Sequence, residues 1–270
     1  MRARLEALLL AALFVTACTP ETAGAPPASP RAPDPSATAS VAVPASRWHV
    51  VLIAGDNNSP AFDNGVRSMR DKLAAQGVRD ISAFTSDPTA NPSLPVATAA
   101  NVSSALRNGG GEACLAFVTS HGDETGFVLK QARGTVGPST LDSALDAGCG
   151  SRPTVVVVSA CHSGVFLTPA MRQPNRIVLT AAAADRASFG CGAGDRYTYY
   201  DQCLLQQFDS VATWQQLAQA TRACVERLEQ RMGVAPPSRP QTFIGSAVAG
   251  LRLPGRQISS ASPCGPANSA

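Results

Sequence analysis

The sequence is poor in aromatic and charged residues, and its basic residues do not cluster. Aromatic side chains make up 5% of the 270 residues and charged ones 15%, and the formal net charge is +3. Surfaces that bind nucleic acids need clustered lysine and arginine side chains, commonly with aromatic residues among them. Because neither feature is present, we expect no nucleic acid among the partners of this chain. The hydrophobic content of 44% is high enough for a sizeable core.

No apolar run in the sequence is long enough to span a membrane. The run near the N-terminus covers about a dozen residues, whereas a spanning helix needs about 20. It follows two arginines and ends in Val15-Thr16-Ala17-Cys18, a pattern typical of a secretory signal whose end resembles a bacterial lipobox. We therefore expect removal of residues 1–17 and acylation of Cys18, with an ordinary cleaved signal as the alternative. Acyl chains would anchor the protein in the bacterial cell envelope. Thr19, in place of an aspartate, favours the periplasmic side of the outer membrane.

Composition divides the rest of the chain into three parts. Between Thr19 and Ser46 there are seven prolines and eight alanines, too little apolar surface to offset the chain entropy of folding. We expect residues 18–46 to form a tether that starts at the acylated cysteine, residues 47–253 to form one folded domain, and residues 254–270 to form a flexible tail.

Strand-like and helix-like segments alternate within the domain. Apolar or β-branched runs predict strands at 48–55, 78–86, 112–122, 152–164, 175–184 and 240–246. Apolar residues at helical spacing predict helices at 61–77, 98–110, 137–150 and 213–233. Such alternation is typical of an α/β fold whose mostly parallel sheet of about six strands is covered by helices on both faces.

Two reactive side chains follow neighbouring predicted strands. His121 comes directly after one strand, and Cys161 comes after the next one along the chain. Sites in open α/β sheets lie at the carboxyl ends of the strands, so these side chains are expected at the same edge. A thiol beside an imidazole can become a nucleophilic thiolate. A buried core thiol or half of a disulfide is the other interpretation of Cys161.

The number of cysteines bears on whether Cys161 is a free thiol or half of a disulfide. Seven cysteines follow Cys18, and an exported protein meets an oxidising compartment in which paired cysteines form disulfides. Because seven is odd, one thiol is expected to stay free. A zinc site at Cys161 and His162 is not expected, since neighbouring side chains point to opposite faces and no second ligand pair is present. His162 is therefore expected to turn away from Cys161, and His49 to be structural.

Three segments carry a resemblance to a known family. The segments "FVTSHGDETGFVL" (117–129), "VVVVSACHSGVF" (155–166) and "VLTAAAADRASFGC" (178–191) resemble blocks of the legumain-like cysteine peptidases, which share a fold with caspases and gingipains. They stand in the same order at a similar spacing, and "AGDNNSPAFDNGV" (54–66) resembles the exported bacterial members. The resemblance covers roughly Trp48 to Ile244 and implies a caspase-like three-layer sandwich.

The resemblance also implies roles for individual residues. Cys161 would be the nucleophile and His121 its partner, the amides of Gly122 and Cys161 would form the oxyanion hole, and Ser188 would line the primary specificity pocket. Removing Cys161 from the seven cysteines leaves six for up to three disulfides. We expect the pairs Cys114–Cys149, Cys191–Cys203 and Cys224–Cys264.

The sequence departs from legumain where that family recognises asparagine. Legumain has an arginine in the loop after its first strand, and the nearest matching position here is Asp63. Legumain also has an acidic residue two positions before the cysteine, where this sequence has Ser159. An acidic pocket favours a basic P1 side chain, so we expect Arg or Lys at P1, with Asp63 or Asp56 as the counter-charge. Asp63 could instead cap a helix or face the solvent.

These observations predict a lipid-anchored cysteine endopeptidase that acts on peptide or protein substrates and needs neither a cofactor nor a metal. Capture of the acyl-enzyme by an amine instead of water would give transpeptidase activity as well. The alternative is a catalytically inactive lipoprotein that uses the caspase-like fold as a binding or scaffold module. The presence of both His121 and Cys161 favours the enzyme.

Overall fold

The computed structural model describes residues 41–256. The predicted signal at residues 1–17, the acylated Cys18, most of the tether and the tail beyond residue 256 lie outside the described residues. Val41 donates a backbone hydrogen bond to Gly250, and the carbonyl of Val43 accepts one from the indole of Trp48, so residues 41–46 contact the folded unit. Within the described range no helix is long and apolar enough to cross a membrane.

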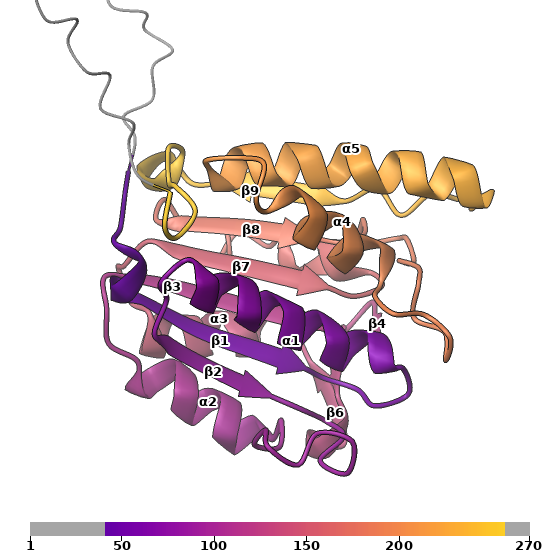
Figure 1. Cartoon of the computed structure of the whole chain (residues 1–270), viewed down its shortest axis with the longest axis horizontal. Coiled ribbons are helices and arrows are strands. Elements are labelled where there is room, and N and C mark those ends of the chain that lie inside the picture. The colour runs from indigo at the N-terminus through magenta and orange to yellow at the C-terminus, as the bar shows by residue number, and fades with distance from the viewer. Residues whose placement is uncertain (1–40, 257–270) are drawn as a thin grey trace, which may run out of the picture. The chain divides into compact units, whose positions relative to one another are not determined.

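A six-stranded sheet forms the centre of the fold (Figure 1). Its strand order is β2-β1-β3-β7-β8-β9; the first five strands are parallel and β9 is antiparallel to β8. The strands are β1 (Trp48–Ala54), β2 (Asp80–Phe84), β3 (Ala113–Thr119), β7 (Thr154–Ser159), β8 (Arg176–Thr180) and β9 (Gln241–Ile244). The predicted α/β class with a mostly parallel sheet of about six strands is confirmed.

Helices cover both faces of this sheet, which gives the predicted three layers. They are α1 (Pro60–Ala75), α2 (Ala99–Asn108), α3 (Pro138–Gly148), α4 (Tyr199–Gln207) and α5 (Trp214–Met232). Alternate residues of β1 belong to different cores because successive side chains of a strand point to opposite faces. Val50 and Leu52 pack with α1, α4 and α5, whereas Val51 and Ile53 pack with α2 and α3.

A second, three-stranded antiparallel sheet follows β3 directly and was not predicted. It consists of β4 (Gly122–Asp123), β5 (Gly126–Leu129) and β6 (Gly134–Val136). The backbone N–H of Val128 donates to His121 and that of Lys130 donates to Gly55, so β5 lies across the carboxyl ends of β1 and β3. Strands this short carry too few residues for a period-two pattern to stand out.

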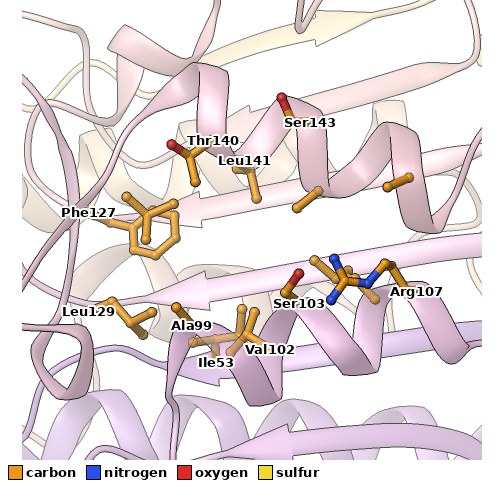
Figure 2. Close-up of a pocket in the computed structure, with 14 residues that line it drawn as sticks. Ile53, Ala99, Val102, Ser103, Arg107, Phe127, Leu129, Thr140, Leu141 and Ser143 are labelled. Atoms are coloured by element: carbon orange, nitrogen blue, oxygen red, sulfur yellow. The ribbon is translucent and has the colours of Figure 1, made fainter.

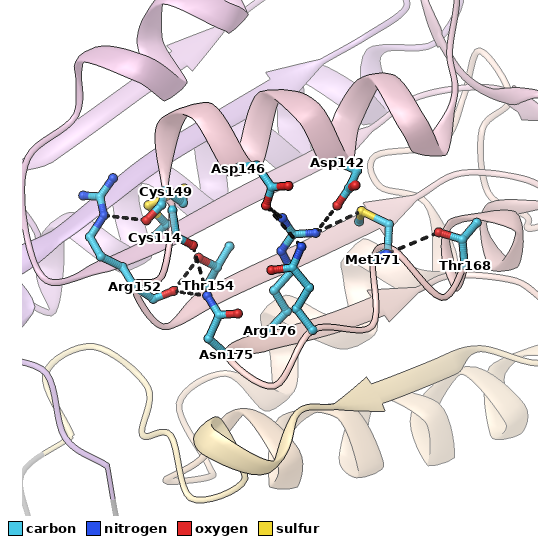
Figure 3. Close-up of polar contacts among 12 residues, drawn as sticks. Cys114, Asp142, Asp146, Cys149, Arg152, Thr154, Thr168, Met171, Asn175 and Arg176 are labelled. Atoms are coloured by element: carbon cyan, nitrogen blue, oxygen red, sulfur yellow. Dashed lines mark hydrogen bonds and ion pairs between the residues drawn. A yellow bond between two sulfur atoms is a disulfide. The ribbon is translucent and has the colours of Figure 1, made fainter.

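A buried arginine ties α3 to the sheet (Figure 3). Arg176 on β8 is 1% exposed, and its guanidinium forms ion pairs with Asp142 and Asp146, one turn apart on α3. The thioether sulfur of Met171 accepts a further hydrogen bond from it. Because a buried charge must be paired to be tolerated, this cluster fixes α3 against the sheet.

Two disulfides are present in the described part of the chain. Cys114 at the start of β3 bonds to Cys149 just after α3, as predicted. The other joins Cys203 to Cys224, so the predicted pairs Cys191–Cys203 and Cys224–Cys264 are wrong. The physical reason is that α4 and α5 pack together in the same core, which brings Cys203 and Cys224 within bonding distance. Cys161 and Cys191 are free thiols, and Cys264 lies outside the described residues.

Candidate active site

The carboxyl ends of β3 and β7 bring the sequence-predicted pair to the same edge of the sheet. Thr119 and Ser159 are register partners in these adjacent parallel strands, and Ser120 N–H donates to the Ser159 carbonyl at 3.0 Å. His121 and Cys161 each come two residues after a register partner. Neighbouring strands are about 4.8 Å apart, so the two side chains leave from adjacent positions.

The turns that follow these strands are in direct contact. A β-carbon placed on Gly122 would lie 2.6 Å from the carbonyl oxygen of Cys161 and 3.0 Å from the β-carbon of Ala160. Only glycine permits this approach, because real β-carbons essentially never come that close to another heavy atom. The backbone next to His121 therefore rests against the backbone of Cys161.

The thiol of Cys161 lies against the loop that contains Ser188. Ser188 N–H donates to the sulfur at 3.2 Å, and the sulfur lies 3.4 Å from the Ser188 carbonyl oxygen and 3.8 Å from its hydroxyl. The structure thus brings together two of the sequence-predicted residues, Cys161 and Ser188. The amide N–H and the hydroxyl of Ser188 are thus both placed beside the sulfur of Cys161.

Contacts on two sides fix the position of His121. Its ring meets that of Phe62, at the start of α1, in an edge-to-face arrangement with centroids 5.1 Å apart, a favourable geometry for aromatic rings. Its carbonyl accepts the hydrogen bond from Val128 in β5. Both the helix that follows β1 and the small sheet therefore determine where the imidazole stands.

The backbone N–H groups of Gly122 and Cys161 make none of the ladder or turn hydrogen bonds found in residues 41–256. His121 and Val128 form the hydrogen-bonded pair of the β4–β5 ladder, so Gly122 and Phe127, the next register partners, form the non-bonded pair. The N–H of Gly122 accordingly points away from β5. The N–H of Cys161 has no acceptor among residues 41–256. Two such donors beside a nucleophile are the requirement for an oxyanion hole.

The other two histidines lie elsewhere. His162 has a left-handed backbone with φ of 56°, its Nδ1 lies 2.9 Å from the carbonyl of Ala184, and its ring therefore faces the loop after β8. His49 is buried at the amino end of β1, where Nδ1 meets Asp80 at 2.8 Å and Nε2 meets the carbonyl of Ala105 at 3.0 Å. These bonds agree with a structural role for His49.

Asp201, which sequence reasoning missed, lies beneath the ends of β3 and β7. The side chain is fully buried; Thr119 donates to its Oδ2 at 2.6 Å, while Oδ1 has no partner within residues 41–256. Burial raises the pKa of this carboxyl to about 6, against the opposing effect of the nearby hydroxyl groups of Thr119, Ser159 and Thr198. Ser159 and Asp201 are thus brought together.

A sequence signal for Asp201 existed. Thr198 and Asp201 match the S/T-x-x-D/E pattern that begins helices, and Thr198 Oγ1 does accept the backbone N–H of Asp201. The pattern marks the start of α4, a helix that is absent from those predicted above. It also places Asp201 in the first turn of that helix.

Asp56 and Asp63 lie nearer β1 and β2 than β7. Asp63 lines a pocket of about 180 Å³ together with Asp87, Asn91 and residues of the loop after β1. Burial raises its pKa, while a hydrogen bond from Thr85 and the charge of Arg67 lower it. Asp56 is 4% exposed and lies 3.8 Å from the ammonium group of Lys130.

The second free thiol, Cys191, follows Ser188 in the same loop and is half-buried. Burial raises its pKa, and the negative charge of a Cys161 thiolate raises it further. Cys191 is therefore held as a neutral thiol near the candidate site. The described residues contain no cluster of three or more His, Cys, Asp or Glu side chains that could hold a metal ion.

Comparisons with known proteins agree with this geometry. Residues 96–233, just over half of the chain, match the model of a family described as the peptidase C13 family, and this range includes His121, Cys161 and Ser188. A crystal structure of caspase-1 from Spodoptera frugiperda is similar in fold, with a TM-score of 0.51 and 12% sequence identity over 79% of this chain and 91% of that chain. At that identity the likeness concerns the fold alone. No curated protein sequence matches the chain.

Proposed function

The chain belongs to the peptidase C13 family and is a cysteine peptidase, and we propose that Cys161 and His121 are its catalytic pair. The observation that supports this assignment is the pairing of β3 with β7, which places the two residues at adjacent positions, together with the contact between Gly122 and the carbonyl of Cys161. The intact pair also argues against an inactive scaffold.

The proposed mechanism follows from this arrangement. The sulfur of Cys161 attacks the carbonyl carbon of the scissile peptide bond, and the carbonyl oxygen gains the negative charge that the amides of Gly122 and Cys161 stabilise. His121 takes the proton of the Cys161 thiol and delivers it to the leaving amine as the C–N bond breaks, and a thioester remains on Cys161. Water then attacks the thioester, which releases the acid and restores the thiol.

An alkylating probe tests the pair directly. We expect iodoacetamide to modify Cys161 faster than Cys191, because the raised pKa of Cys191 keeps that thiol neutral. Cys161→Ala should abolish peptide cleavage, and His121→Ala should lower both cleavage and the labelling rate of Cys161. Cys191→Ser is the matched control and should keep both. If Cys161 is labelled at the same rate in His121→Ala as in wild type, the catalytic pair is disproved. An inactive scaffold would then be the remaining interpretation.

We also propose that the peptidase prefers substrates with a basic residue at P1. Asp56 lies beside Lys130, and the charge of Arg67 acts on Asp63, so each of these acids already has a cation nearby. Asp201 takes part in no ion pair in the described residues, and its known partners are hydroxyl groups. A carboxylate in a low-dielectric interior attracts a cation over a longer distance than one in water. Asp201, beneath Ser159, is therefore the counter-charge that we assign.

Substrates that differ only at P1 test this specificity. We expect kcat/KM for Arg and Lys peptides to exceed that for the Asn peptide by about tenfold or more. The preference should grow as the pH rises through about 6, where Asp201 ionises. Asp201→Asn should remove the preference, whereas Asp63→Asn should retain it. Faster cleavage of the Asn peptide would disprove a basic P1.

Two further proposals concern the fate of the acyl-enzyme and the location of the protein. An added peptide with a free amino terminus would compete with water for the thioester and give a ligated product, detectable by mass spectrometry.

For the location we propose a lipid anchor on Cys18 at the periplasmic face of the bacterial outer membrane. Metabolic labelling with a fatty acid analogue should mark the wild type and not Cys18→Ser.

A further inference from the structure

An apolar cavity of about 320 Å³ lies between α2 and α3, separate from Cys161 and Ser188 (Figure 2). Val102 and Leu106 of α2 form one wall and Leu141 of α3 forms the other, while Ile53 of β1 lies at the base. At one end Phe127 of β5 closes it. The volume is in the range of small-molecule sites, and neither the proposed peptidase function nor the family match assigns it a ligand.

The cavity is lined by one charged side chain, and its charge is positive. None of the residues that line it is acidic, and the only charged one is Arg107, near the carboxyl end of α2. Figure 2 shows its guanidinium beside Ser103, and the residue is exposed at the edge of the cavity. Among residues 41–256 Arg107 has neither an ion pair nor a hydrogen-bond partner. A free guanidinium beside an apolar cavity complements an anionic group attached to an apolar body.

The shape of the cavity narrows the choice of ligand. The lining residues of α2 run from Ala99 to Arg107, which is about 12 Å along a helix axis at 1.5 Å per residue. Those of α3 run beside them from Thr140 to Ala147. A space of this length between two helices fits an extended hydrocarbon chain.

We propose that this cavity binds a free aliphatic carboxylate, a medium-chain fatty acid in chemical terms. The chain lies between α2 and α3, and the carboxylate pairs with the guanidinium of Arg107. Burial of successive methylene groups supplies affinity, and the ion pair selects the anionic head group over a neutral or cationic one.

The bound chain also contacts a residue that touches the candidate active site. Phe127 is the register partner of Gly122, and its ring stacks on that of Phe166 with centroids 5.7 Å apart. Phe166 belongs to the short helix Ser163–Phe166 that follows Cys161 and His162. A ligand that fixes Phe127 therefore acts on both sides of the proposed oxyanion hole. This effect on activity rests on the proposed function, whereas binding does not.

Displacement of a fluorescent dansyl-labelled fatty acid from the protein tests the site. Decanoate, decanol and decylamine share one chain and differ in head-group charge. We expect decanoate to compete about tenfold more strongly than decanol, because a hydrogen bond to a charged group is worth roughly one factor of ten or more. Decylamine should compete least. Arg107→Gln should make decanoate and decanol equal.

Substitutions on α2 separate this site from adsorption elsewhere. Ser103→Leu places a larger side chain in the cavity and should weaken all three competitors, while Ser104→Leu, on the exposed side of the same helix, should change none. Circular dichroism verifies that each variant is folded. Equal competition by decanoate against wild type and Ser103→Leu, or no preference for decanoate over decylamine, would overturn the proposal. Binding without any peptide cleavage would instead leave the site standing and reject the proposed function.

Discussion

The carboxyl of Asp201 lies in an environment that favours its neutral, protonated form. It lies under the sheet edge with no solvent exposure, and burial raises its pKa from 3.8 to about 6. The hydroxyl of Thr119 offsets only part of this cost. Ionisation of this one side chain should therefore be visible in the stability of the whole protein.

Asp201→Asn should change how stability depends on pH. Between about pH 4 and pH 6 the folded wild type holds a proton that the unfolded chain has lost, so its free energy of unfolding falls as the pH rises and levels off above pH 6. Asparagine has no such proton and can still accept the hydrogen bond from Thr119. The variant should gain about 2–3 kcal/mol relative to wild type across this range. Urea unfolding at a series of pH values measures it.

An exposed acid provides the control for this measurement. Asp185 is 70% exposed, so Asp185→Asn should follow the wild-type pH profile closely. If Asp201→Asn also runs parallel to wild type from pH 4 to pH 8, the carboxyl of Asp201 does not titrate as described.

The sequence led to some site residues and not to others for a physical reason. The proposed pair, His121 and Cys161, each end an apolar strand, and strand ends of a parallel sheet meet at one edge. The setting of Asp201 depends instead on three segments far apart in sequence, which supply Thr119, Ser159 and Thr198. No local pattern contains that information.

Elements of the main sheet were predictable because burial on both faces leaves long apolar runs. The strands around Val50 and Val156 are examples, and each is completely buried. β4 to β6 were missed because they have two to four residues each. Helix α4, "YYDQCLLQQ", was also missed, since its nine residues are too few for a helical period to stand out.

The small sheet gives the proposed oxyanion hole its shape, and Gly122→Ala tests this. The added methyl group would lie 2.6 Å from the carbonyl oxygen of Cys161, so β4 must move away from that turn. Loss of one well-placed oxyanion donor costs about 100-fold or more in rate. We expect kcat/KM on a fluorogenic peptide to fall by about that factor.

Gly134→Ala is the matched control in the same small sheet. A β-carbon at Gly134 meets no atom within 4 Å, so kcat/KM should stay within about twofold of wild type because surface substitutions away from special features have small effects. Equal losses in both variants would show that the contact between Gly122 and Cys161 has no special importance.

Two disulfides link elements of the described fold. Cys114–Cys149 ties the amino end of β3 to α3, and Cys203–Cys224 ties α4 to α5. Their sequence separations of 35 and 21 residues correspond to about 3 to 4 kcal/mol each in the chain-entropy treatment of cross-links. The second pairing was not predictable from the sequence, because connectivity depends on how helices pack.

Replacement of each cysteine pair should lower the free energy of unfolding. We expect Cys203→Ala with Cys224→Ala to reduce it by about 3 kcal/mol in urea titrations, since the loop between α4 and α5 regains its freedom in the unfolded chain. Iodoacetamide labelling of Cys161 in the folded variant should stay at the wild-type rate. An unchanged unfolding midpoint would mean that this disulfide does not constrain the unfolded chain.

The turn that joins β5 to β6 leaves residues 131–133 exposed. No hydrogen bond of the main ladder passes through this turn. Insertions and deletions are best tolerated at such exposed loop tips. Evolution can therefore lengthen or exchange this tip without disturbing β3 or β7. Differences in length among relatives should accumulate there, and it offers a place to graft a foreign recognition sequence onto the peptidase.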